Sequence, residues 1–206
     1  RTRRRPEDAR SVRDGLARLL YDSLFDWLMQ RMNQVLMPPS ASQPTSATSC
    51  HSFGVLDIAG FENFQANSLE QLLINLSNEY LQQSFNDTVF KAEIQDCEAE
   101  GIPSVSALAF SDNLDCLELL DGTAGGARER EPGILDLLDE VVALPRATNA
   151  AFVAKVVAKF SGKEPGKGHA RFVAPRFGGQ PTFTVKHFAG DITYNCDGWI
   201  EKTADR

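Results

Sequence analysis

The sequence predicts a mixed α/β fold that is mainly helical, and three observations lead to this prediction. Apolar residues recur at helical spacing through residues 14–35, and no glycine or proline interrupts residues 67–100. Residues 182–195 instead alternate apolar and polar side chains around a turn that contains Gly190. The first two patterns are typical of helices, and the third is typical of a β-hairpin.

The first helical pattern covers residues 14–35. Its main apolar residues lie four positions apart: Leu16, Leu20, Leu24, Leu28 and Met32. Additional apolar neighbours make this stripe wide, which predicts a largely buried helix. In the isolated chain we expect the apolar faces of residues 16–32 and 53–56 to be exposed. Residues 38–50 are rich in proline and small polar residues, so we expect a flexible connector there.

A short apolar run, Phe53–Leu56, follows the connector and ends at Asp57. An apolar run of this length before a turn with Gly60 is typical of a buried parallel strand that leads into a loop. We therefore expect a strand and a functional loop within residues 53–62.

The long helix over residues 67–100 has a recognisable start. Asn67 is the expected N-cap, because Glu70 stands three residues later, where a capping box needs its acceptor. The chain first meets a glycine again at Gly101, which marks the expected end of the helix.

Residues 112–162 read as a group of shorter helices. We expect helices over 112–120, 133–142 and 148–160, with a glycine-rich loop over 121–130. Thr148 or Asn149 is the expected N-cap of the last of them.

Composition excludes several classes of protein. The chain has 206 residues, 42% of them hydrophobic, and a formal charge of −7, which disfavours a dedicated nucleic-acid-binding protein. No apolar run is long enough for a membrane span. The four cysteines and three histidines are scattered without metal-ligand spacing, so we expect no metal site built from them. The chain does not begin with Met, and we expect it to be part of a longer protein.

Asp57 and Gly60 carry the clearest chemical signal. In nucleoside triphosphatases, an acid at the end of a strand holds Mg²⁺ through water, and a glycine three residues later lets a backbone N–H approach the γ-phosphate. The DxxG pattern alone is weak, because a strand that ends in Asp before a glycine turn is also a common structural feature.

The surrounding residues resemble the myosin motor domain. LDIAGFENF (residues 56–64) with the following NSLEQLLINLSNEYLQQSFN resembles switch II and the relay helix of that family. Three further segments resemble other motor regions in the same order: RDGLARLLYDSLFDWLMQRMN, GILDLLDEVVALPRATNAAFVAKV and FTVKHFAGDITYNCDGWIEKTADR. The resemblance covers residues 10–206 and looks unconventional in class rather than muscle-type. It implies part of the P-loop NTPase myosin-motor fold, with one strand of the central sheet, the long relay helix, a helix-loop-helix and a β-hairpin.

The resemblance also implies roles for individual residues. Asp57 would hold the Mg²⁺-bound water, the Gly60 amide would bind the γ-phosphate, and Glu62 would pair with a switch I arginine and order the attacking water. Four residues would transmit closure of switch II along the relay helix: Phe61, Phe64, Asn75 and Glu79. For the two aromatic residues, a plain core role is an equal alternative. The implied cofactor is ATP with Mg²⁺ in a complete motor, with no direct metal ligand on this chain.

The region 112–162 resembles the actin-binding subdomain of myosins. Its hydrophobic tip would consist of Pro132, Gly133, Ile134, Leu137, Leu144, Pro145 and Arg146. The alternative is that Ile134, Leu137 and Leu144 simply pack the helix pair together. The implied partners are the actin filament and the remainder of the motor domain, and the implied location is the cytoplasm and its actin cytoskeleton.

The sequence contains no GxxxxGK[ST] loop and no switch I segment. We therefore predict that this chain alone neither binds ATP tightly nor hydrolyses it. Two other interpretations stay open. One is a degenerate myosin that binds actin or nucleotide without efficient ATPase cycling, and the other is a non-catalytic helical interaction module.

Overall fold

The structure is a computed structural model that describes residues 6–36, 53–102, 112–123, 130–162, 168–175 and 180–204. The chain divides into two compact units, residues 1–57 and residues 58–204.

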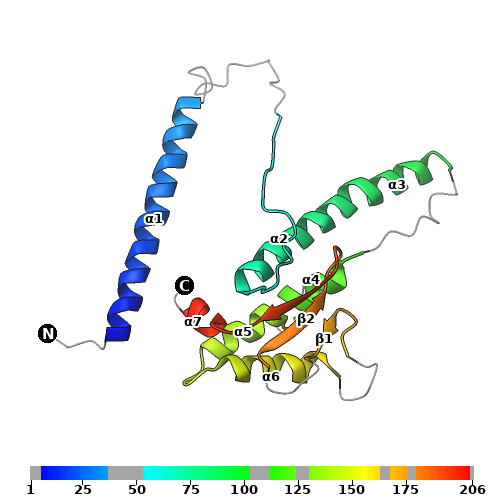
Figure 1. Cartoon of the computed structure of the whole chain (residues 1–206). Helices are drawn as coiled ribbons and strands as arrows, with labels where there is room; N and C mark the ends of the chain where they lie inside the picture. The colour runs from blue at the N-terminus through cyan, green and yellow to red at the C-terminus, as the bar shows by residue number, and fades with distance from the viewer. Residues whose placement is uncertain are drawn as a thin grey trace. The chain divides into compact units, whose positions relative to one another are not determined.

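Helices make up most of both units, and a small antiparallel sheet completes the second (Figure 1). The elements are α1 (Pro6–Leu36), α2 (Leu69–Phe85), η2 (Asn86–Lys91), α3 (Ala92–Ala99), α4 (Leu114–Asp121), α5 (Ile134–Val142), α6 (Asn149–Phe160), β1 (Phe172–Val173), β2 (Thr182–Lys186), β3 (Asp191–Asn195) and α7 (Trp199–Ala204). This arrangement confirms the predicted mainly helical, mixed α/β class.

Helix α1 is the regular element of the first unit. It begins at Pro6, earlier than the predicted start near residue 14, because proline is well suited to the first helical position. The apolar face over residues 16–32 is exposed, as expected for the isolated chain, so α1 is not the buried helix that the width of its stripe predicts. Leu16, Leu20 and Leu24 are 56–62% exposed, because the described residues of this unit contain no second element for them to pack against. Despite its length, α1 is too polar to cross a membrane, and the same holds for every other described helix.

The strand predicted at residues 53–56 is not formed in this chain. These residues lack regular secondary structure, and Phe53, Val55 and Leu56 are 70–93% exposed. A strand needs a hydrogen-bonded neighbour, and no described residue pairs with this segment. The connector expected over residues 38–50 lies outside the described residues.

Helices α2 and α3 follow each other as one rod, with the π-helical segment η2 between them (Figure 1). The rod covers residues 69–99, close to the predicted 67–100. Its N-cap is Ser68 rather than the predicted Asn67, and Gln71 takes the capping-box role expected of Glu70, because its Oε1 accepts from the Ser68 amide at 2.9 Å. Gly101 follows the rod with a φ of 80°, a conformation that favours glycine.

The helices α4, α5 and α6 lie close to their predicted ranges. Thr148 is the N-cap of α6, and its hydroxyl accepts from the Ala151 amide at 3.2 Å. Of the predicted loop over 121–130, residues 124–129 lie outside the described part. The two ends of this loop meet closely, because the Thr123 amide donates to the Glu131 carbonyl at 3.0 Å.

Strands β2 and β3 form the hairpin, with Phe183 opposite Tyr194 and Val185 opposite Ile192. These four side chains are buried, so one face of the sheet packs against the helices. The sequence interpretation missed β1, which pairs with β2 to give the order β1-β2-β3, and it also missed α7.

The core of the second unit joins this sheet face to the helices α2, α4, α5, α6 and α7. Its largest fully buried side chains are Trp199, Tyr194, Phe152 and Phe183. The Phe183 ring lies 5.8 Å from the Trp199 ring in an edge-on arrangement, which is a favourable geometry for aromatic pairs. This core supports α2 along its first four turns, which also carry the buried polar residues Asn75 and Glu79.

Candidate functional site

The candidate site begins where the chain reaches the core of the second unit. Asp57 and Gly60 are exposed, and a Cβ atom added at Gly60 would meet nothing within 4 Å. Phe61 is half-buried, and its ring lies edge-on to the rings of His187 at 5.0 Å and Phe188 at 5.4 Å. The first side chain of this segment to pack against the core is therefore that of Phe61.

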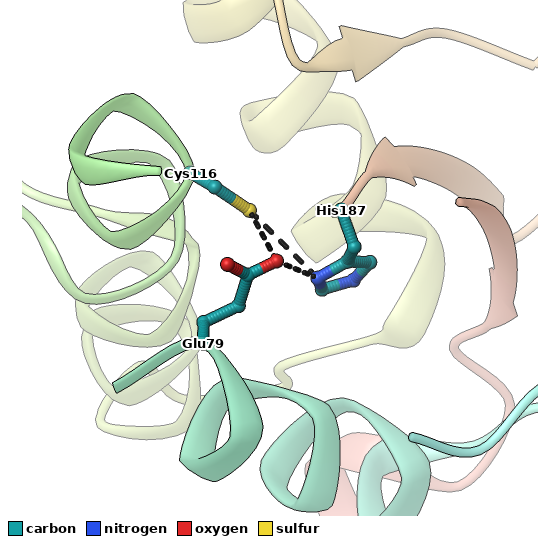
Figure 2. A group of neighbouring side chains, drawn as sticks. All are labelled: Glu79, Cys116 and His187. Carbon is teal, nitrogen blue, oxygen red and sulfur yellow. Dashed lines mark hydrogen bonds and ion pairs between the residues drawn. The ribbon is translucent and has the colours of Figure 1, made fainter. Parts of the chain in front are cut away.

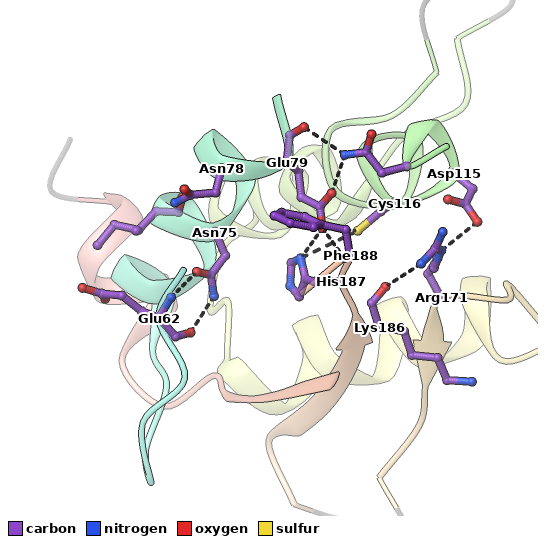
Figure 3. A network of polar contacts seen from close by, with 12 residues as sticks. Glu62, Asn75, Asn78, Glu79, Asp115, Cys116, Arg171, Lys186, His187 and Phe188 are labelled. Carbon is purple, nitrogen blue, oxygen red and sulfur yellow. Dashed lines mark hydrogen bonds and ion pairs between the residues drawn. The ribbon is translucent and has the colours of Figure 1, made fainter. Parts of the chain in front are cut away.

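Asn75 of α2 holds the backbone of Glu62 at two points (Figure 3). Its Oδ1 accepts from the Glu62 amide at 2.8 Å, and its Nδ2 donates to the Glu62 carbonyl at 2.9 Å. Asn78, one turn later, donates to the Ala59 carbonyl at 3.0 Å. The Glu62 carboxylate accepts from Gln71 Nε2 at 3.1 Å. These contacts join the 59–62 backbone directly to the first turns of α2.

Asn67 connects the same segment to the sheet. Its Oδ1 accepts from the Phe64 amide at 2.7 Å, and its Nδ2 donates to the Thr193 carbonyl at 3.2 Å. Its own carbonyl accepts from the Asn195 amide at 2.8 Å. The Phe64 side chain is 58% exposed, so Phe64 is held by its backbone and contributes little to the core.

Glu79, one turn beyond Asn75, is a fully buried carboxylate with several donors. Its Oε1 accepts from His187 Nδ1 at 2.9 Å and from the Phe188 amide at 3.0 Å, and its Oε2 accepts from Asn113 Nδ2. Burial alone would raise the pKa of Glu79, but the hydrogen bonds from His187, Asn113 and Phe188 outweigh it, so the pKa lies below its ordinary value. Glu79 is therefore charged at neutral pH.

Figure 2 shows Cys116 of α4 and His187 pointing toward the Glu79 carboxylate. The potential ligand atoms of these three residues all lie within 4.8 Å of one another, although their positions in the sequence are far apart. The Cys116 thiol donates to Glu79 Oε1 at 3.4 Å, and burial raises the pKa of this thiol. A cation would have to displace this thiol proton and the His187 proton together. We therefore assign the group to a hydrogen-bonded network, and we propose no metal for it.

The network continues from His187 toward Asn75. His187 Nε2 lies 2.8 Å from the Tyr194 hydroxyl, which in turn accepts from Asn75 Nδ2 at 2.9 Å. Asn75, Tyr194 and His187 are buried, so water does not compete for these contacts. An unbroken line of hydrogen bonds thus runs from Glu79 to the backbone of Glu62.

Arg171 links two of the elements that contribute to this network (Figure 3). Its Nε donates to the Asp115 carboxylate at 2.8 Å, and its Nη1 donates to the Lys186 carbonyl at 3.5 Å. These contacts join α4 to the end of β2, directly beside His187. They hold the two elements that place Cys116 and His187 around Glu79.

The predicted hydrophobic tip between α5 and α6 divides into a buried and an exposed part. Ile134 and Leu137 are at most 3% exposed and belong to the core, and Gly133 is also buried. The turn between the helices is exposed and consists of Leu144, at 58%, with Pro145 and Arg146. Pro132 is half-buried. The burial of Ile134 and Leu137 corrects their predicted place at a contact surface, because their side chains are used in packing α5.

Sequence reasoning placed Asn75 and Glu79 at the site but missed His187, Tyr194, Cys116 and Asn113. The sequence did carry a signal for His187 and Tyr194. His187 lies two residues after Val185, and Tyr194 lies two residues after Ile192. Period-two spacing puts these residues on the same buried face. Cys116 and Asn113 carried no such signal, because only the fold brings α4 beside α2.

The comparison with protein families decides which family this arrangement represents. A family model described as "Myosin head (motor domain)" matches residues 2–206, nearly the whole chain. This chain belongs to the myosin head family. The mainly helical fold with its small three-stranded sheet is accordingly part of a myosin motor domain.

Several curated myosins are similar to this myosin segment over almost its entire length. Myosin-7 of Arabidopsis thaliana is 40% identical over 200 residues, which cover 97% of this chain and 10% of that protein. Myosin-2B of Naumovozyma castellii is 43% identical over 195 residues, or 94% of this chain and 12% of that protein. Myosin-4 of Saccharomyces cerevisiae is 41% identical over 194 residues, again 94% and 12%. The chain thus spans only about a tenth of the length of these relatives.

Proposed function

We propose that this chain is the switch II, relay-helix and lower actin-binding part of an ATP-driven, actin-based myosin motor. The observation that carries the proposal is the two-point contact between Asn75 and the Glu62 backbone. Through this contact, displacement of residues 59–62 would act directly on the first turns of the rod formed by α2, η2 and α3.

The residues of the exposed segment suit a terminal phosphate. Gly60 has no side chain and open space around it, so its amide is free to approach an anion. Asp57 is exposed and would hold the water around Mg²⁺, and Glu62 would orient the attacking water. Bound ATP with Mg²⁺ supplies the phosphoryl group and the cation that neutralises developing charge. The chain's own contribution is positioning, because Phe61 packs immediately before Glu62 and Asn75 holds the Glu62 amide and carbonyl.

The proposed role of Glu62 is tested in a complete motor domain that contains this chain. Glu62→Gln keeps the size and the contact with Gln71 but removes the charge. We expect kcat of the ATPase to fall by about 10²–10³-fold while ATP still binds. An unchanged kcat would reject the role, and a complete motor that binds no ATP would favour the degenerate myosin. The isolated chain should show no ATPase activity, and turnover that depends on Asp57 would contradict that expectation.

The exposed turn of Leu144, Pro145 and Arg146 is the proposed contact for actin. It presents an apolar side chain beside a positive charge, as interface centres often do. The formal charge of −7 on the chain makes electrostatic steering toward an acidic filament unfavourable. Leu144→Ser in the complete motor should weaken cosedimentation with actin, whereas Leu114→Ser, at a similarly exposed leucine of α4, should not. Equal effects of the two variants would reject this contact.

A further inference from the structure

The buried line of hydrogen bonds behind Glu62 has a single consistent direction. The charged Glu79 carboxylate can only accept, so His187 must donate from Nδ1. In a neutral imidazole, Nε2 is then an acceptor, and the Tyr194 hydroxyl donates to it. The Tyr194 oxygen is left to accept from Asn75 Nδ2. With a neutral His187 ring, the charge on Glu79 thereby determines which way every hydrogen in the line points.

The direction matters most at Asn75. Its Nδ2 group has two hydrogens, one for Tyr194 and one for the Glu62 carbonyl, and its Oδ1 accepts from the Glu62 amide. If the amide turned over, its donor would face the Glu62 amide and its acceptor would face the Glu62 carbonyl. A Tyr194 hydroxyl that is held as an acceptor therefore stabilises the one Asn75 orientation that binds both backbone groups of Glu62.

We propose that Glu79 and His187 are positioning residues for Glu62, which they orient through Tyr194 and Asn75. His187 is the central member, because its two ring nitrogens contact residues on opposite sides, Glu79 and Tyr194. All four members are at most 4% exposed, so the chain of dipoles acts in a medium where water cannot replace a lost contact. The positioning itself is independent of nucleotide chemistry, and its effect on hydrolysis rests on the function proposed above.

Two substitutions of His187 separate its two contacts. His187→Asn places an amide near the position of Nδ1, so it keeps a donor for Glu79 and loses the acceptor for Tyr194. His187→Gln reaches the position of Nε2, so it keeps an acceptor for Tyr194 and loses the contact with Glu79. Thr193→Val is the matched control, because the Thr193 hydroxyl contacts only Thr184 on the exposed face of the same hairpin.

The measurement is hydrogen exchange of the Glu62 amide in the 206-residue chain, followed by NMR, with the Val156 amide in α6 as the internal reference. We expect His187→Asn to speed exchange at Glu62 by about tenfold relative to Val156, as loss of one buried hydrogen bond would. His187→Gln should have a clearly smaller effect, and Thr193→Val should have none. Equal acceleration at Glu62 and Val156, or equal effects of the two His187 variants, would overturn the proposal.

A second measurement distinguishes this inference from the proposed function. In a complete motor domain, His187→Asn should lower kcat of the ATPase and leave KM for ATP unchanged, and His187→Gln should restore part of kcat. If exchange at Glu62 responds to the two variants as expected but kcat does not, the positioning stands and the catalytic role of Glu62 fails. If exchange does not respond, the positioning is wrong whatever the ATPase shows.

Discussion

Helices α1 and α2 are both long, and both carry apolar residues at helical spacing, but only α2 buries them. Leu24 of α1 is 60% exposed, whereas Leu72 of α2 is fully buried. The described part of the first unit offers α1 no partner, whereas α2 lies against α4 and the hairpin. Helical spacing therefore identifies a helix and its apolar side, but burial requires a second surface that the spacing does not specify.

The same contrast divides the LDIAGFENF segment. Residues up to Gly60 are exposed and irregular, whereas Phe61 packs on His187 and Glu62 is held by Asn75. A segment that is free at one end and anchored at the other can move without unfolding the core. This is the arrangement that a phosphate sensor linked to a helix needs.

The largest expected effect on stability comes from removing the buried Glu79 carboxylate of α2. Glu79→Ala would leave His187 Nδ1 and the Phe188 amide without their acceptor, at about 1–3 kcal/mol for each buried donor. Asn113 would lose one of its two contacts and keep the one to the residue-79 carbonyl. We expect the free energy of unfolding of the second unit to fall by about 3–5 kcal/mol in urea titrations. Ser77→Ala, on the exposed side of the same helix, should change it by no more than about 0.5 kcal/mol. A similar loss in both variants would contradict the network.

A paired truncation tests the comparison of α1 with α2 directly. Leu72→Ala removes a fully buried side chain and should reduce the free energy of unfolding by about 2–5 kcal/mol. Leu24→Ala removes an exposed one and should have an effect within about 0.5 kcal/mol. Urea titrations of both variants measure the difference. If Leu24→Ala were equally costly, α1 would have a packing partner.

Two glycines provide a smaller test of the same comparison. A Cβ atom at Gly133 would lie 2.3 Å from the Gly122 amide nitrogen, so Gly133→Ala should destabilise the second unit by about 1–3 kcal/mol. A Cβ atom at Gly15 in α1 would meet nothing within 4 Å, and Gly15→Ala should stabilise that helix by about 0.5–1 kcal/mol. Thermal unfolding monitored by circular dichroism resolves these opposite signs. If Gly15→Ala were also destabilising, the space around Gly15 in α1 would not be empty.

The smallest expected effect is the pH dependence of the contact between α2 and α7. The hydrogen bonds from Lys202 and Ser68 lower the pKa of Glu70 from 4.5 to about 2. A lowered pKa in the folded state means that the contact stabilises the fold above pH 4.5 and is lost as the pH falls toward 2. The Glu70 side chain is 55% exposed, so we expect only about 0.2–1 kcal/mol.

This dependence is measured as the difference in free energy of unfolding between the natural chain and Lys202→Met. The difference should be fully present at neutral pH and should shrink as the pH falls from 4.5 toward about 2. Glu118→Gln, which replaces another exposed carboxylate, is the control for general acid effects. A difference that persists in acid would show that Lys202 stabilises the fold by another contact.

Local patterns in the sequence were informative where local forces decide the structure. The N-cap at Thr148 follows from a hydrogen bond to an amide three residues away, and the hairpin follows from alternation around a short turn. The strand β1 was missed because two residues carry too little pattern to be recognised. The strand at residues 53–56 was predicted in error because its pattern was right for a strand but no described residue pairs with it.

By itself, the sequence determined the helices other than α7, the hairpin and the family, because these depend on short-range periodicity and on collinear motifs. Only the tertiary structure decided which apolar faces are buried and which polar groups meet. Glu79, Cys116 and His187 are dispersed along the chain, and their contact exists because α2, α4 and the end of the hairpin converge on one core. Burial there excludes water, and each polar atom must then find its partner in the protein.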